Sequence, residues 1–210
     1  MKILALELSS HRGSIARADD GDEMFASEFA NDRQHSGAFF EKLSQVTKQC
    51  EPADVIVVGL GPGSYAGVRI AIAAAIGLGA ATNARLIGLP SICAIPTNAT
   101  RYAVVGDARR QTFYYAAVSD RECTEGPVLL SEVELRGRLD DLDGTPVYAT
   151  ELLPTFEQVE TRAPSASILA QLVARAPLPE ISVPLEPLYL RAPHITASKQ
   201  PAPIFNVRAL

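Results

Sequence analysis

Residues 61–69 read Gly-Pro-Gly-Ser-Tyr-Ala-Gly-Val-Arg and join the apolar run of residues 55–59 to an alanine-rich segment. This order predicts a strand, a glycine turn and a helix. Backbone N–H groups converge at the start of such a helix, where the positive end of the helix dipole favours an anion. The segment therefore places a candidate binding site and decides the fold class around it.

The spacing of the glycines matches neither of two familiar phosphate-binding patterns. A Walker loop ends in Lys followed by Ser or Thr, and the third glycine of a dinucleotide fingerprint comes one residue earlier than Gly67. A purely structural turn, with Ser64 as helix N-cap, and an anion site both stay open. The residues that would form the anion or nucleotide contact are Gly61, Gly63, Ser64, Gly67 and Arg69.

The residues before and after this turn predict an α/β fold. Residues 2–8, 14–18 and 23–29 have the pattern of three antiparallel strands, and residues 35–50 carry apolar side chains at helical spacing. A meander followed by strand, helix and strand is typical of an actin-like or ribonuclease-H-like lobe. Each lobe of such a fold is a mixed sheet with flanking helices.

A second lobe is expected after residue 100, because residues 102–105 and 112–118 predict another hairpin with a polar turn. We expect an N-terminal lobe over 1–100, a smaller lobe over 101–190 that includes a helix near 165–176, and a proline-containing tail over 191–210. One short strand is expected near residues 188–190.

The helix predicted over residues 68–81 has hardly a polar face, since most of its residues are alanine, glycine or isoleucine. A helix that is apolar all round is buried on both sides. One side would face the sheet of its own lobe, and the other would face another helix or a partner subunit.

Composition limits the classes of function. The chain has 210 residues, 47% hydrophobic residues and a net charge of −5, which argues against a stand-alone nucleic-acid binder. Its three cysteines are widely spaced and indicate neither a disulfide framework nor a zinc site. No stretch has the pattern of a signal peptide or a membrane span, so we expect a cytoplasmic protein without membrane contact.

Candidate catalytic groups are few. Glu7 lies in an otherwise apolar strand, where it would hold a metal ion or simply face solvent, and the second reading is favoured. Arg109 and Arg110, beside Asp107 in the second-lobe turn, would pair with that carboxylate or with an anion, and an ordinary surface ion pair with Asp107 is favoured. The histidines are isolated, so no metal site and no catalytic residue is predicted.

Several stretches, in the right order, resemble the TsaB (YeaZ) family of bacterial tRNA threonylcarbamoyladenosine synthesis. The glycine turn is similar to the family's Gly-Pro-Gly-Ser-Phe-Thr-Gly-Leu-Arg-Ile hallmark. The other stretches are residues 4–10, 33–36, 107–110 and 187–191, which resemble its first strand, its Arg-x-His-Ser, its Asp-Ala-Arg turn and its Pro-x-Tyr-Leu-Arg tail.

The resemblance implies a non-catalytic paralogue of the transferase TsaD that binds and activates it. The His-x-x-x-His metal pair of TsaD is matched by His35 but then by Phe39, so the metal site is absent. The resemblance also implies that an ATPase, TsaE, joins the complex as its third subunit. It further implies that a second copy of the chain binds when TsaD is missing, and that tRNA is contacted only indirectly. The implied partner interface comprises His35, Phe39, Leu43, Val68, Ile72, Ala75 and Ile76.

Two departures from the family argue against ATP binding by this chain alone. Glu7 stands where the family usually has Asp, and residues 149–153 replace a glycine-rich turn of the second lobe. No cofactor is expected, and ATP or ADP would bind only in complex with the partner. The alternatives are a stand-alone actin-fold phosphotransferase or peptidase, based on Glu7, Asp107 and the glycine turn, and a homodimeric interaction module.

Overall fold

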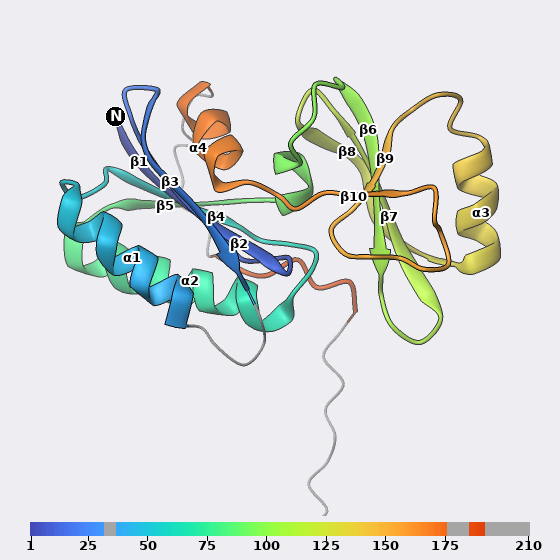
Figure 1. The fold of residues 1–210 in the computed structure, drawn as a ribbon, viewed down its shortest axis with the longest axis horizontal. Coiled ribbons are helices and arrows are strands. Elements are labelled where there is room, and N and C mark those ends of the chain that lie inside the picture. The colour runs from blue at the N-terminus through green and yellow to red at the C-terminus, as the bar shows by residue number, and fades with distance from the viewer. Residues whose placement is uncertain (32–36, 176–184, 192–210) are drawn as a thin grey trace, which may run out of the picture.

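Two five-stranded sheets, one in each lobe, organise the chain (Figure 1). The computed structural model describes residues 1–31, 37–175 and 185–191. The strand order is β3-β2-β1-β4-β5 in the first sheet and β10-β9-β6-β7-β8 in the second. The protein therefore has the two-lobed ribonuclease-H-like fold that the order of elements predicts.

The first lobe is built around β1, which pairs antiparallel with β2 and parallel with β4. Its elements are β1 (Lys2–Glu7), β2 (Arg12–Asp19), β3 (Asp22–Ala30), α1 (Gly37–Gln49), β4 (Val55–Gly59), α2 (Tyr65–Thr82), β5 (Arg85–Leu89) and the short 3-10 helix η1 (Ser91–Ala94). Every residue of β4 is buried, which explains its unbroken apolar sequence.

Helices cover both faces of this sheet. Alternate side chains of β1 point to opposite faces, so that Leu4 and Leu6 meet α1 and α2 while Ile3 and Ala5 meet α4 (Ala166–Arg175). Figure 1 shows α1 and α2 on one side of the sheet and α4 on the other.

The position of α4 corrects the expected domain boundary. This helix lies within the range 101–190 assigned to the second lobe, but its buried residues Leu169 and Val173 pack on the first sheet. The physical reason is that β1 is buried on both faces, and the two long helices before residue 100 lie on the same face. The first lobe therefore recruits its second cover from the far end of the chain.

The second lobe repeats the arrangement on a smaller scale. Its strand β6 (Arg101–Asp107) pairs antiparallel with β7 (Thr112–Ser119) and parallel with β9 (Val147–Ala149). The remaining elements are β8 (Glu122–Ser131), α3 (Glu132–Asp140) and β10 (Glu160–Thr161). The strand expected near 188–190 is not formed, since residues 185–191 are irregular; residues 192–210 of the expected tail lie outside the described residues.

The described helices include one, α2, that is long and apolar enough to cross a membrane. In this fold α2 instead packs one side on the first sheet, where Val68, Ala71, Ile72 and Ala75 are buried. Its other side is exposed. Within this chain the helix is therefore buried on one side only, whereas the sequence predicted burial on both.

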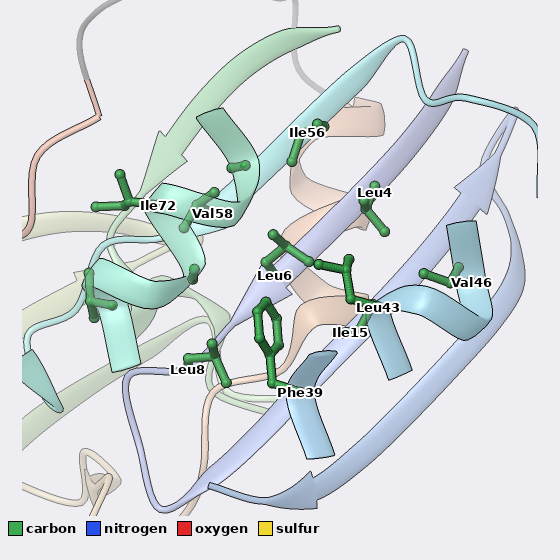
Figure 2. Packing of buried hydrophobic residues seen from close by; sticks show 13 residues of the cluster. Leu4, Leu6, Leu8, Ile15, Phe39, Leu43, Val46, Ile56, Val58 and Ile72 are labelled. Atoms are coloured by element: carbon green, nitrogen blue, oxygen red, sulfur yellow. The ribbon is translucent and has the colours of Figure 1, made fainter. Parts of the chain in front are cut away.

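The same packing corrects the predicted partner interface (Figure 2). Phe39 and Leu43 of α1, and Val68, Ile72 and Ala75 of α2, lie in the core of the first lobe, where at most 7% of the area of each is exposed. Ile76 alone among the described members of that set is at the surface, with 51% of its area exposed. His35 lies outside the described residues.

Candidate functional site

A cavity of about 910 Å³ lies between the two lobes, where loops that follow β1, β4, β6 and β9 face one another. The first lobe contributes residues 9–11 and 63–66, and the second contributes residues 107–109 and 150–151. Residues 187–191 complete the wall. Ligands of open α/β sheets bind outside the carboxyl ends of the strands, which makes this interlobe cleft the first candidate site.

The glycine turn lies at the cleft, but most of its polar groups bond within the protein. The amide of Gly61 donates to Ser91 Oγ at 2.9 Å, and the amide of Ser64 donates to the carbonyl of Ser9 at 2.6 Å. Ser64 Oγ accepts from the amide of Gly67 at 3.3 Å, so Ser64 is the N-cap of α2, as the sequence predicts.

Close backbone approach explains two of the glycines. A Cβ at Gly63 would overlap the carbonyl oxygen of Ser9, and a Cβ at Gly67 would overlap that of Leu8. Gly63 also has φ +154°, where other residues are strained. The turn lets α2 begin directly against the end of β1, which is a structural role.

The expected anion contact is thereby reduced to a few groups. Gly63 and Ser64 line the cleft, together with Tyr65 and Ala66, whose amides belong to the first helical turn and have no intrahelical acceptor. Arg69 does not line the cleft; its guanidinium lies over the Tyr65 ring and donates to the Tyr65 hydroxyl at 3.0 Å.

The opposite wall of the cleft carries Asp107 and Arg109. Both oxygens of Asp107 accept from Arg109, Oδ1 from the amide at 2.6 Å and Oδ2 from Nη1 at 2.9 Å. Arg109, Arg110 and Gln111 all have positive φ, so this turn holds three successive non-glycine residues in the left-handed region. The surface ion pair that the sequence favoured is present, and it occupies the carboxylate of Asp107.

Glu7 corrects another expectation, because it does not face solvent. The residue is fully buried and does not line the cleft. Oε1 accepts from the amide of Ser9 at 2.6 Å, whereas Oε2 is a buried atom with no hydrogen-bond partner among the described residues. Burial raises the pKa of Glu7, and the hydrogen bonds from Ser9 only partly offset this effect. A carboxyl group that is sealed away from the cleft cannot bind a ligand there.

Within residues 1–31, 37–175 and 185–191, no three His, Cys, Asp or Glu side chains are grouped so that they could hold a metal ion. The cleft offers hydrogen-bond donors from the Ser64 hydroxyl, from the start of α2 and from Arg191. This set of groups is suited to holding a polar ligand, and it contains no nucleophile paired with a base.

A second candidate site is the exposed side of α2, which we call the α2 face. Ile76 is its largest apolar side chain, and a Cβ at Gly77 would meet no atom within 4 Å. Phe40 of α1 is also half exposed. The remaining small exposed residues of the face are Ala73, Ala80 and Ala81. Small side chains allow another backbone to approach closely, so this face suits a protein partner.

Sequence reasoning missed the part of the cleft that comes from segments without a charged or glycine motif. Asn31 donates from Nδ2 to the carbonyls of Leu8 and Ser10, at 2.9 and 2.7 Å, and so fixes the loop after β1. Thr150 and Glu151, which the sequence marked only as part of the segment that replaces a glycine-rich turn, line the second-lobe wall. The available signal was topological, because β1, β4, β6 and β9 all end toward the same cleft.

Residues 32–126 match the family described as TsaD, tRNA N6-adenosine threonylcarbamoyltransferase. An uncharacterized protein of Mycobacterium leprae is 36% identical over 159 residues, which cover 72% of this chain and 42% of the relative. An uncharacterized protein of Mycobacterium bovis is 35% identical over 143 residues, which cover 67% of this chain and 65% of the relative. The matches thus span about two-fifths to two-thirds of these relatives.

Two solved structures from Pseudomonas aeruginosa share the fold. One is an uncharacterized protein with similarity to the peptidase YeaZ, with a TM-score of 0.69 and 21% identity, covering 90% of this chain and 99% of the other. The other is YeaZ itself, with a TM-score of 0.67 and 21% identity, covering 81% and 89%. The two-lobed arrangement is therefore common to all three chains.

Proposed function

The chain belongs to the TsaB (YeaZ) family of TsaD-related proteins, and from this premise we propose that it is a non-catalytic subunit that binds and activates TsaD in tRNA N6-threonylcarbamoyladenosine synthesis. The observation that carries the proposal is the α2 face, an exposed apolar surface on a helix whose other side is core. A subunit that works by association needs such a surface and needs no catalytic groups of its own.

The proposed contact differs from the one that the sequence suggested. It uses Ile76 and Gly77 of α2 and Phe40 of α1, because the buried residues of these helices are committed to the first lobe. In the absence of TsaD, the same face would pair with a second copy of the chain. We further propose that TsaE joins the complex, that tRNA is contacted mainly through TsaD, and that the complex works in the cytoplasm.

Nucleotide binding is proposed only for the complex. The first-turn amides of α2 are available at the cleft, but Asp107 is already paired with Arg109 and Glu7 is sealed beneath the turn. The same two observations weigh against the alternative of a stand-alone phosphotransferase or peptidase, which would need those carboxylates. A partner that completes the cleft would supply the missing groups.

The test is co-purification of the chain with the TsaD of its own organism, followed by an assay of tRNA modification. Ile76→Glu places a charge in the α2 face and is expected to abolish association and the stimulation of TsaD. Val133→Glu is the matched control, because Val133 is an exposed apolar residue of α3 on the other lobe, and it should leave both unchanged. Full association of the Ile76→Glu chain would show that another surface binds TsaD.

A further inference from the structure

Residues 185–191 cross from one lobe to the other beside the cleft, as the orange-red segment in Figure 1 shows. Three contacts attach this segment to the first lobe. The amide of Leu188 donates to the carbonyl of Leu60 at 2.9 Å, and the ring of Tyr189 lies 5.6 Å from that of Tyr65. Leu185 packs against the core that lies under α1 and α2.

Two contacts attach the other end of the segment to the second lobe. Leu190 packs against the cluster in which Tyr102 and Tyr148 of the second lobe meet Ile92 and Ile95 at the start of the connector. Arg191 donates from Nη2 to Thr112 Oγ1, and Thr112 Oγ1 in turn donates to the carbonyl of Arg109 at 2.8 Å. The segment therefore ends on the left-handed turn that holds Asp107.

The covalent connections between the lobes lie together, outside the lining of the cleft. The chain leaves the first lobe after η1 and returns before α4, and the amide of Ser165 donates to the carbonyl of Ala94 at 3.0 Å where the two crossings meet. Neither residue lines the cleft, whereas residues 187–191 do. Two adjacent crossings would leave the lobes free to rotate about them, whereas a third tie beside the cleft would restrict that rotation.

We propose that residues 185–191 are a latch that sets how far the interlobe cleft opens, by tying the first turn of α2 to the turn between β6 and β7. The latch rests on contacts within this chain and does not depend on the proposed association with TsaD. Its contacts act in series, so losing them on either lobe releases the tie as a whole. Opening would free the start of α2 from Tyr189 and the second-lobe turn from Arg191.

Hydrogen–deuterium exchange of the full chain tests the latch, because each lobe has reporter amides beside it. In the first lobe these are Ser64 and Val68, and in the second they are Ala108 and Thr112. Tyr189→Ala removes a first-lobe contact, yet it is expected to speed exchange at the second-lobe reporters by about fivefold or more, equivalent to losing about 1 kcal/mol of local stability. Tyr189→Phe keeps the ring and should resemble the unsubstituted chain.

The reciprocal substitution completes the design. Arg191→Ala removes a second-lobe contact and should speed exchange at the first-lobe reporters, while the amides of β1 and β4 stay protected in every variant and show that the fold is retained. If each substitution alters exchange only within the lobe that it contacts, or only within residues 185–191, the segment is a passively packed tail and the latch is refuted.

Discussion

Glu7 and Gly59 face each other across the pair of parallel strands β1 and β4, and the Glu7 carboxyl occupies the space in which a Cβ of residue 59 would lie. Ser91 Oγ fills the other side of that space. Gly59 is therefore the residue that allows an acidic side chain to be buried directly beneath the glycine turn. The two positions are coupled by volume rather than by charge.

Gly59→Ala is expected to destabilise the chain by about 1–3 kcal/mol, because the added methyl group overlaps Glu7 and Ser91 in a packed interior. Urea unfolding of the single variant measures this cost. The shorter side chain of Glu7→Ser should recover part of it in the double variant, so the two substitutions should be less harmful together than their sum. Strictly additive effects would contradict the packing described here.

Glu7→Gln should stabilise the chain at neutral pH. Burial raises the folded-state pKa of Glu7 above its ordinary value of 4.5, so its stabilising contribution is complete below that value and is lost as pH rises toward the folded pKa. The glutamine side chain mimics the protonated acid and does not titrate. The advantage of Glu7→Gln should grow by about 1.4 kcal/mol per pH unit above pH 4.5 until the folded pKa is reached.

This expectation is checked by urea unfolding at a series of pH values between roughly 4 and 8. In this range the titration of acidic groups is separable from that of lysines. Glu23→Gln is the control for removing one acidic group from the chain, since Glu23 is an exposed residue of β3. A constant difference between Glu7→Gln and the unsubstituted chain would mean that Glu7 is ionised in the folded state.

The burial of Glu7 illustrates what the sequence could not supply. The apolar alternation of β1 predicts a strand, but one acid among apolar residues fits equally well at an exposed strand end or in a sealed site. Whether Glu7 is exposed or buried depends on Gly59 of β4, which makes room for the carboxyl group. The order of elements and the N-cap at Ser64 are local properties, and these the sequence did predict.

The α2 face shows the same limit on a helix. Composition predicts an apolar helix, yet it does not determine the rotation of the helix against the sheet. Ile72 and Ile76 are only about 40° apart around the axis, and the edge of the buried stripe passes between them. Similarly, nothing in the local pattern of residues 166–175 tells which lobe will bury that helix.

Two glycines of α2 offer a paired test of the rotation that the structure gives this helix. Gly77→Ala should raise the free energy of unfolding by about 0.5–1 kcal/mol, because alanine favours helix and its Cβ meets no neighbour. Gly79→Ala should lose this gain, since its Cβ would lie 2.8 Å from Leu86 Cδ2. Both variants are compared by urea unfolding at one protein concentration. Equal effects at the two positions would show that the helix is rotated differently.

Arg121 fixes the connector that leads from the first lobe into the second, and its removal should loosen that connector. Its guanidinium donates from Nη1 to the carbonyl of Ile95 and from Nη2 to the carbonyl of Thr97, at 2.5 and 2.6 Å. Arg121→Ala should cost about 1–3 kcal/mol, because Ile95 is buried and its carbonyl would lose this donor. Arg121→Lys should recover only part, since an ammonium group lacks the planar fork that reaches both carbonyls. Replacement of the exposed Arg101 by alanine controls for the loss of one positive charge. An equal loss of stability in that variant would show that the hydrogen bonds of Arg121 to the connector do not stabilise the fold.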